Sequence, residues 1–274
     1  MHRDIPDEYN YDVIFPIARI DYTTKYSIES AINQTYKYNK FIVIIDTCDE
    51  DMIDKIMSFF TEIKRCEIYY TRNKGPAKAR NFGIFNSKAE YIALLDSDDV
   101  WHKNKIMLQM KSLQNNNYDF SITSYIATKF DLTSGIFLVS YNKRPSLKIV
   151  KYLNFIGNST VLCKRELLIS IGGYIDIPSK NDLATWIKLS NKNSIKLDYI
   201  NEPLCLIAKN KGSVSSNKSI KAIIKAHSIN HKRYIAFINS LIFIVLLPYV
   251  RLCRMIRFKI VIGKNYKQIL KTFI

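Results

Sequence analysis

The chain has no acidic residue after Glu202. It carries 41 Lys and Arg against 24 Asp and Glu, a net charge of +17 over 274 residues. Up to Glu202 the 27 basic residues nearly balance the 24 acids, whereas residues 203–274 hold the other 14 Lys and Arg. Such asymmetry favours contact with anions, either phospholipid head groups or nucleic acid. No DNA- or RNA-binding motif is present, which favours lipid over nucleic acid.

Cysteine is sparse and has no pattern. The five cysteines are Cys48, Cys66, Cys163, Cys205 and Cys253, and no two are spaced as CxxC. An odd number at irregular spacing argues against a disulfide framework and against a zinc site. The start, MHRDIPDEYN, also lacks the apolar core of a secretory signal. We therefore expect a reduced, cytoplasmic setting.

The first hundred residues alternate between two kinds of pattern. Runs rich in β-branched and aromatic residues predict strands at Tyr11–Pro16, Lys40–Asp46, Cys66–Thr71 and Tyr91–Asp96. Helices are predicted between them, at about residues 24–34, 49–63 and 77–86. This alternation predicts a parallel α/β sheet with helices on both faces, in which ligands bind outside the carboxyl ends of the strands.

The last of these strands ends in a cluster of carboxylates. In YIALLDSDDVW, Asp96, Asp98 and Asp99 follow the apolar run, and Asp46 stands at the end of another predicted strand. Carboxylates this close raise one another's pKa unless a cation joins them, and Mg²⁺ or Mn²⁺ suits such oxygen ligands. The alternative is that Asp98 or Asp99 only caps a helix predicted over residues 101–113.

A second motif precedes the carboxylates. In NKGPAKARNFGI, Asn73 and Gly75 predict a turn, a helix begins at about Pro76, and Arg80 lies on its second turn. The helix N-terminus and Arg80 are suited to an anion, most simply a diphosphate. The alternative is that Arg80 only pairs with a surface acid.

These motifs, in this order, resemble the family 2 glycosyltransferases of the bacterial surface-polysaccharide type. The resemblance is carried by YDVIFPIARID, SIESAINQTYKYNKFIVIID, NKGPAKARNFGI and YIALLDSDDVW, the last similar to a metal-binding D-x-D element. NSTVLCKRELLISIGGY and NDLATWIKLS resemble the acceptor side of the family. The resemblance implies the GT-A fold, with a Rossmann-like nucleotide-binding sheet and an acceptor-side half, and sugar transfer with inversion.

The resemblance also implies roles for individual residues. Donor binding is implied for Pro16, Asp46, Asn73, Gly75, Arg80, Asp96 and Asp98. Asp98 and Asp96 would hold Mn²⁺ or Mg²⁺, Asp182 would be the catalytic base, and Trp186 and Asp99 are possible acceptor-side residues. From the residues alone, Asp182 or Ser179 could instead cap a helix, and Trp186 could belong to the core.

The sequence departs from the family pattern at three places. The opening turn reads PIARI where the family has a PTYNR-like turn, and DTCD replaces the usual DDGS after the second strand. Asn181 stands before Asp182 in place of the usual glutamate. These changes leave the first acid after the second strand and the acid at the base position.

The predicted organisation is one catalytic domain and a tail. Residues 1–210 would form the GT-A domain, with the nucleotide-sugar half at about 10–101 and the acceptor half at about 102–210. A hairpin is predicted across Thr133–Gly135. Residues 211–274 would be a basic helical segment, in which residues 234–250 contain no charge. We expect this stretch to lie in the interface of an anionic membrane, the alternatives being a membrane span or a buried helix.

The function expected from this resemblance is metal-dependent, inverting sugar transfer. The donor would be a nucleotide-diphosphate sugar, expected to be a UDP-sugar, and the acceptor a hydroxyl of a glycan, expected to be linked to a polyprenyl diphosphate. The enzyme would act peripherally at the inner face of the cytoplasmic membrane, in surface polysaccharide or lipopolysaccharide synthesis. The alternatives are a nucleotidyltransferase-like phosphate enzyme and a non-catalytic, membrane-bound nucleotide-sugar binder.

Overall fold

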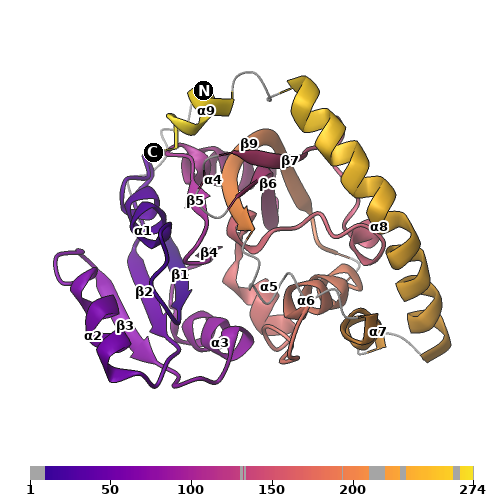
Figure 1. Cartoon of the computed structure of the whole chain (residues 1–274). Coiled ribbons are helices and arrows are strands. Elements are labelled where there is room, and N and C mark those ends of the chain that lie inside the picture. Colours follow the sequence, from indigo (N-terminus) through magenta and orange to yellow (C-terminus); the bar gives the residue numbers. More distant parts are fainter. Residues whose placement is uncertain are drawn as a thin grey trace.

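The N-terminal half is a parallel sheet with intervening helices. The computed structural model describes residues 10–129, 132, 134–192, 194–209, 220–228, 233–261 and 266–273. The first four strands are β1 (Tyr11–Ile17), β2 (Lys40–Ile45), β3 (Cys66–Tyr70) and β4 (Tyr91–Leu94), and they lie parallel in the order β3-β2-β1-β4. They alternate with α1 (Thr24–Ile32), α2 (Glu50–Ser58) and α3 (Pro76–Asn86). The predicted alternation is confirmed, and the strand order reverses at β1, where such sheets form their ligand crevice (Figure 1).

The sheet continues into the second half with mixed strand directions. Its further strands are β5 (Val100–Trp101), β6 (Phe120–Lys129), β7 (Gly135–Val139), β8 (Leu162–Lys164) and β9 (Leu197–Lys209). β8 is antiparallel to β4 and to β6, while β9 is parallel to β6 and antiparallel to β5. β7 pairs antiparallel with β6, as the predicted hairpin requires, although Thr133 lies outside the described residues.

The helices of the second half surround this part of the sheet. They are α4 (Lys105–Asn116), α5 (Arg165–Ser170) and α6 (Asn181–Ser190), with 3-10 turns η1 (Leu147–Lys151) and η2 (Asn158–Thr160). The sequence predicted a helix beginning at residue 101, and this starting point was wrong. Trp101 belongs to β5, where its N–H donates to Ser30 Oγ at 3.0 Å, and the helix has Asn104 as its N-cap.

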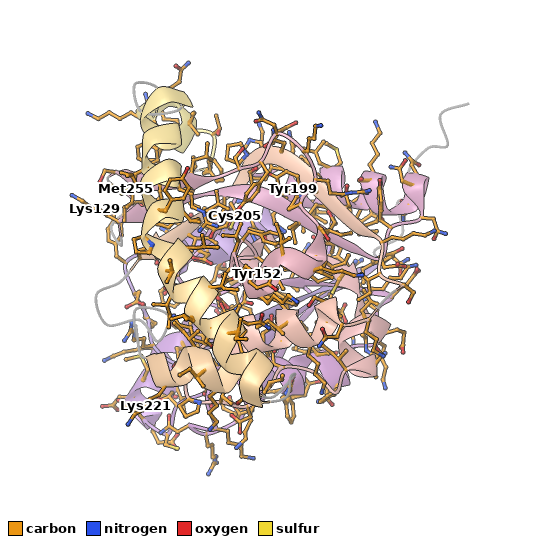
Figure 2. The ribbon with its side chains drawn as sticks, turned by 90° about the vertical axis from the view of Figure 1, so that its right-hand side faces the viewer. Lys129, Tyr152, Tyr199, Cys205, Lys221 and Met255 are labelled. Carbon is orange, nitrogen blue, oxygen red and sulfur yellow. The ribbon has the colours of Figure 1, made fainter. Side chains whose placement is uncertain are left out.

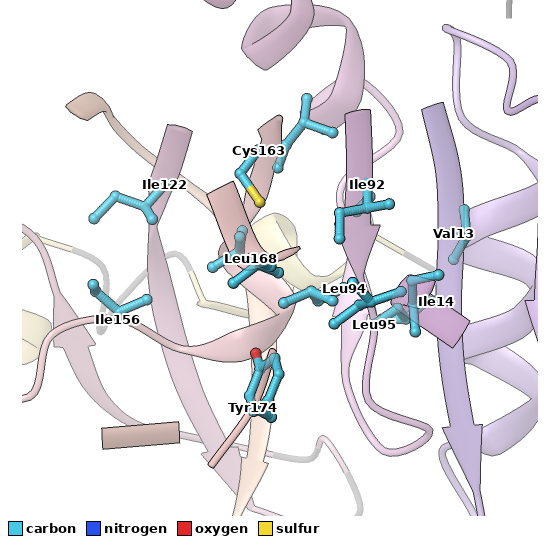
Figure 3. Close-up of a cluster of buried hydrophobic side chains, with 14 of the residues drawn as sticks. Val13, Ile14, Ile92, Leu94, Leu95, Ile122, Ile156, Cys163, Leu168 and Tyr174 are labelled. Atoms are coloured by element: carbon cyan, nitrogen blue, oxygen red, sulfur yellow. The ribbon is translucent and has the colours of Figure 1, made fainter. Parts of the chain in front are cut away.

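One hydrophobic core joins the two halves. Val13 and Ile14 of β1 are fully buried beside Ile92 and Leu94 of β4, and on the other side lie side chains of β6, β8 and α5 (Figure 3). Parallel strands buried on both faces are expected to be largely apolar, as β1 and β2 are apart from Asp12 and Lys40 near their starts. The core therefore fixes the carboxyl ends of β1, β2 and β4 relative to the second half.

Three further helices follow the sheet. They are α7 (Ile220–Ser228), α8 (Arg233–Val261) and α9 (Tyr266–Leu270). α8 packs against β7, α7 and η1, on the side of the molecule opposite α2 and β3 (Figure 1). Close to α9, Phe273 packs on the ring of His102, and Tyr266 donates to the carbonyl of Leu132 at 3.0 Å. Among the described helices, none has the length and apolarity needed to cross a membrane.

Lys105 is a fully buried lysine at the start of α4. Its Nζ donates to Gln109 Oε1 at 2.7 Å and lies 4.4 Å from the ring centroid of Trp101. Burial lowers the pKa of Lys105 from 10.5 to about 7, since the charged form loses its hydration. The folded protein therefore carries an ammonium group that releases its proton near neutral pH.

We expect this lysine to make stability depend on pH. The unfolded chain keeps the proton up to about pH 10.5, whereas the folded chain releases it near pH 7. Unfolding therefore takes up a proton between these values, and the free energy of unfolding should rise by about 1.4 kcal/mol per pH unit within the window. Lys105→Met should remove this slope and be more stable than the wild type at pH 7. Urea unfolding of both proteins from pH 7 to 10 measures the difference, and parallel curves would contradict the assignment.

Candidate active site

The carboxylate turn after β4 is held on two sides. Ser27 of α1 donates to the carbonyl of Ser97 at 3.0 Å, and the N–H of Asp96 donates to Ser159 Oγ at 3.0 Å. Ser159 is itself fixed, because its carbonyl accepts from Trp101 Nε1 at 2.7 Å. The turn that carries Asp96 and Asp98 is therefore rigidly placed at the carboxyl edge of the sheet.

Asp96 forms an ion pair with the buried Arg80. Nη2 of Arg80 lies 2.5 Å from Oδ1 of Asp96, while Nη1 donates to the carbonyl of Pro76 at 3.3 Å. Burial alone would lower the pKa of Arg80, but the Asp96 carboxylate raises it well above its ordinary value. The guanidinium is thus permanently charged and also lies over the ring of Tyr174, 5.3 Å from its centroid. Arg80 therefore does not pair with an isolated surface acid, as the alternative had it, but with a partly buried aspartate of the carboxylate cluster.

Asp98 and Asp99 have different surroundings. Asp99 is buried, accepts from Ser159 Oγ at 2.5 Å and from the N–H of Ala208 at 3.1 Å, and so connects the turn to β9. Asp98 is half-buried and accepts no hydrogen bond from any other residue in the described part of the chain. Burial first, and then the charge of Asp96, raise the pKa of Asp98 to about 6. Its carboxylate oxygens are available to a ligand.

Asp99 neither caps the helix that follows the turn nor lies where it could contact an acceptor. The helix that Asp98 or Asp99 was expected to cap begins at Lys105, so neither residue is its N-cap. Asp99 points into the protein with both oxygens occupied, which corrects its candidate role on the acceptor side. Burial, and then Asp98, raise the pKa of Asp99 well above its ordinary value.

Asp46 shapes the loop between β3 and α3. Its Oδ1 accepts from Thr71 Oγ1 at 2.7 Å and from the N–H of Lys74 at 2.8 Å, and its Oδ2 accepts from the N–H of Gly75 at 2.9 Å. This loop contains Asn73 at φ 58° and Gly75 at φ 91°, conformations that need local support. Both carboxylate oxygens of Asp46 are used inside the protein, and Pro16 lies in β1 beside Ile44 of β2.

Asp182 reaches the cluster from the second half. It lies in the first turn of α6, is half-buried, and is near enough that its charge raises the pKa of both Arg80 and Tyr174. Within the described residues no side chain or N–H donates to its carboxylate. The N-cap of α6 is Lys180 at φ 63°, so neither Ser179 nor Asp182 caps this helix. The charges of Asp96 and Asp182 thus both act on Arg80.

Trp186 is a core residue. It is fully buried, with its ring 5.5 Å from those of Phe120 and Tyr174. A side chain without exposed surface cannot stack on a sugar, which corrects its candidate acceptor-side role. The apolar face of α6 instead uses Trp186 to fix the helix that carries Asp182.

Several residues of the site were not singled out from the sequence. Asn81, next to Arg80, donates to the carbonyl of Tyr174 at 2.8 Å and accepts from its N–H at 2.6 Å. The Tyr174 hydroxyl donates to Asn158 Oδ1 at 2.9 Å, and Asn158 Nδ2 reaches Asp96 Oδ2 at 3.4 Å. Lys209, the last residue of β9, partly offsets the raised pKa of Asp98 and Asp99. Asn158 and Tyr174 lie in a quoted motif, whereas Lys209 was one lysine among many.

A cleft of about 270 Å³ opens beside this cluster, between the start of α3 and the segment before α6. Gly75, Pro76 and Ala77 line one side of it, and Ile177 and Asn181 line the other. At a helix start the first N–H groups have no partner within the helix, which suits an anion or a polar ligand. Asn181, which precedes Asp182 in the chain, is the lining residue nearest in sequence to that carboxylate.

A divalent cation fits this site through one protein ligand. In the part of the chain that the structure describes, no three His, Cys, Asp or Glu side chains converge as metal ligands. Asp98 nevertheless offers an unoccupied carboxylate among crowded acids, and Mg²⁺ and Mn²⁺ commonly combine one or two carboxylates with water and phosphate oxygens. Asp96 is largely occupied by Arg80, so Asp98 is the residue suited to the cation.

We expect Asp46→Asn to loosen the β3–α3 loop. The amide can replace only part of the three hydrogen bonds, so the free energy of unfolding should fall by about 1–3 kcal/mol. Trypsin should then cleave faster at the exposed Arg72 and Lys74, measured by limited proteolysis with mass spectrometry. Asp49→Asn is the matched control, because asparagine preserves the N-cap of α2. Equal cleavage rates in the two variants would contradict this role of Asp46.

Comparison with known proteins agrees with this geometry. Residues 22–168 match the family model described as Glycosyl transferase family 2. An uncharacterized glycosyltransferase of Rickettsia bellii is 36% identical over 196 residues, which cover 70% of this chain and 28% of that protein. This chain thus spans about a third or less of the length of the Rickettsia relatives it matches.

Relatives of similar length and a solved structure extend the comparison. The Escherichia coli UDP-Glc:alpha-D-GlcNAc-diphosphoundecaprenol beta-1,3-glucosyltransferase WfaP is 33% identical, over 74% of this chain and 78% of that one. Staphylococcus aureus TarS, solved in complex with UDP-GlcNAc, superposes with a TM-score of 0.65 at 16% identity, over 86% of this chain and 71% of that one. The family and the fold expected from the motifs are confirmed: the chain belongs to glycosyl transferase family 2 and has the GT-A fold.

Proposed function

We propose that this protein is an inverting glycosyltransferase that moves a sugar from a UDP-sugar to a hydroxyl of a glycan carried on a polyprenyl diphosphate. The observation that carries the proposal is that Asp98 and Asp182 accept no hydrogen bond from another described residue and lie on two different elements close enough to the Arg80–Asp96 ion pair to interact with it electrostatically. Family membership supports the reaction class. The residues 1–210 would form the catalytic domain, divided at about residue 101.

The leaving diphosphate would be bound at the carboxyl edge of the sheet. Mn²⁺ or Mg²⁺ held by Asp98 would, when bound, stabilise the negative charge that develops on this leaving group. Lys209 would add a positive charge from the end of β9. Arg80 and Asn158 hold Asp96 in place, and Asp46 holds the loop with Asn73 and Gly75 against the donor.

The acceptor hydroxyl would be activated by Asp182. As the bond between the anomeric carbon and the diphosphate oxygen breaks, the acceptor oxygen forms a bond on the opposite face of the sugar. Its proton passes to the Asp182 carboxylate, which has no hydrogen-bond donor among the described residues and is free to receive it. One displacement of this kind inverts the configuration at the anomeric carbon.

The named relatives support the substrate classes. WfaP and a second Escherichia coli protein, WfgD, are both named as UDP-glucose transferases acting on a diphosphoundecaprenol-linked sugar, and WfgD is 29% identical over 77% of this chain. The TarS complex contains UDP-GlcNAc. A polyprenyl acceptor lies in a membrane, so we place the enzyme at the inner face of the cytoplasmic membrane, in surface polysaccharide synthesis.

Asp98→Asn should abolish metal-dependent donor binding. The neutral amide is a poorer ligand for a hard cation, so the Kd for a UDP-sugar with Mn²⁺ should rise at least about tenfold, as measured by calorimetry. With EDTA present, wild type and variant should bind the donor equally weakly. Tight, metal-dependent binding by Asp98→Asn would contradict the role of this residue.

Asp182→Asn should abolish transfer and leave donor binding intact. Removal of a general base costs about 10² to 10⁴ in kcat, whereas the donor Kd should stay within about twofold. Transfer is followed as release of UDP in the presence of metal and a polyprenyl-diphosphate glycan, with Asp54→Asn as the control at an exposed position on α2. Release of pyrophosphate in place of UDP would indicate a nucleotidyltransferase, and donor binding without turnover by the wild type would indicate a non-catalytic binder.

A further inference from the structure

The long helix α8 has its polarity reversed relative to an ordinary surface helix. Its inward side includes Asn239, Ser240 and Phe243, all buried, and Arg254, which donates to Tyr141 Oη at 3.1 Å and to the carbonyl of Asn154 at 3.2 Å. Three of these four residues are polar or charged, and Ile244 also packs against the core, so the inward side is mixed in polarity. A helix on a protein surface usually buries its apolar side and exposes its polar one.

The outward side of α8 is apolar. Among the side chains that the structure describes on this helix, each exposed one is aliphatic, methionine, proline or tyrosine. Val245 is 66% exposed, Tyr249 68% and Leu252 55%. We define the outer face of α8 by its exposed residues Ile238, Leu241, Ile242, Val245, Tyr249 and Leu252, whose spacing of three and four places them on one side of the helix.

The exposed apolar residues of α8 have basic residues near them, because α8 packs against α7, which carries two lysines and a histidine. Figure 2 looks onto this side of the molecule, where α8 crosses the body with Met255 on its upper part and Lys221 near its lower end. Lys221 and Lys225 of α7 are exposed, as are Lys267 and Lys271 near α9. The whole segment after Glu202 has no acidic residue.

A second copy of the chain is a poor match for the outer face. Two molecules meeting through α8 would bring together two segments that each hold 14 Lys and Arg and no Asp or Glu. Like charges at this density repel, whereas anionic lipid head groups attract them. Exposed aliphatic side chains with a tyrosine, beside lysines, are the composition of helices that lie in a bilayer interface.

We propose that the outer face of α8 is a lipid-docking face, which lies in the interface of a bilayer containing anionic lipid while the inner face stays packed on the protein. Helix α8 contacts β7, α7 and η1, and α7 and η1 in turn contact α6. Docking would therefore hold α6, which carries Asp182, at a fixed height above the lipid surface. That last consequence rests on the proposed function, whereas the docking itself does not.

Vesicle co-sedimentation of the full chain tests this proposal. The probe is a phosphatidylcholine vesicle with and without phosphatidylglycerol, at low and high salt. The wild type should sediment with the anionic vesicles, and Val245→Asp combined with Leu252→Asp should lower the partition coefficient at least about tenfold. Phe82→Asp combined with Phe85→Asp is the matched control, because it adds the same charge at exposed apolar positions of α3, and its binding should equal that of the wild type.

Two further measurements distinguish a specific loss of vesicle binding from unfolding and from loss of activity. Circular dichroism and thermal unfolding should show that the α8 variant is folded, as expected for substitutions at exposed positions, and its UDP release from a soluble donor should equal that of the wild type. Absence of wild-type binding, or equal binding by the α8 variant, would overturn the proposal, as would a dimer in light scattering that the variant abolishes. Loss of vesicle binding in a protein that releases no UDP would support docking and count only against the proposed reaction.

Discussion

The ion pair between the buried Arg80 and the partly exposed Asp96 is the interaction on which the site depends. It joins α3 to the turn after β4, and both partners have further contacts: Arg80 lies over Tyr174, and Asp96 is reached by Asn158. Removing Asp96 would leave the charge of the buried Arg80 guanidinium uncompensated, which is destabilising. Because Arg80 lies over Tyr174, and Tyr174 is also held by Asn81, the pair is one of the places where the first half contacts the second.

The aspartates of the site fall into two groups: those whose carboxylate oxygens accept hydrogen bonds from the protein, and those whose oxygens do not. Asp46 and Asp99 each accept hydrogen bonds at both carboxylate oxygens from groups of the protein itself, so they shape loops. Asp98 and Asp182 have no such partners among the described residues, and they are the carboxylates that we propose act on a ligand. Because the four side chains are chemically identical, the difference between them comes from the groups that the fold places around each carboxylate.

The second half contributes support as well as chemistry. Trp186 and Tyr174 pack together in the core and so fix both the start of α6 and the floor under Arg80. Gly173, at φ 77°, lets the backbone pass Asn81, since an added Cβ would lie 2.3 Å from Asn81 Oδ1. Helix α8 extends this arrangement to the opposite side of the molecule, with polar anchors inward and an apolar strip outward.

The sequence by itself determined the alternating strands and helices of residues 11–94, because buried parallel strands require continuous apolar runs that periodicity reveals. It also made Asp96, Asp98, Arg80 and Asp182 candidates for the site, since each stands in a motif at the end of a strand or near the start of a helix. Only the tertiary structure showed which of the aspartates accept no hydrogen bond from another described residue. Burial and hydrogen bonds between distant segments removed Asp99 and Trp186 from the candidates and added Asn158, Tyr174 and Lys209. Local patterns record the chemistry of a side chain, whereas its partners come from elements far away in the chain.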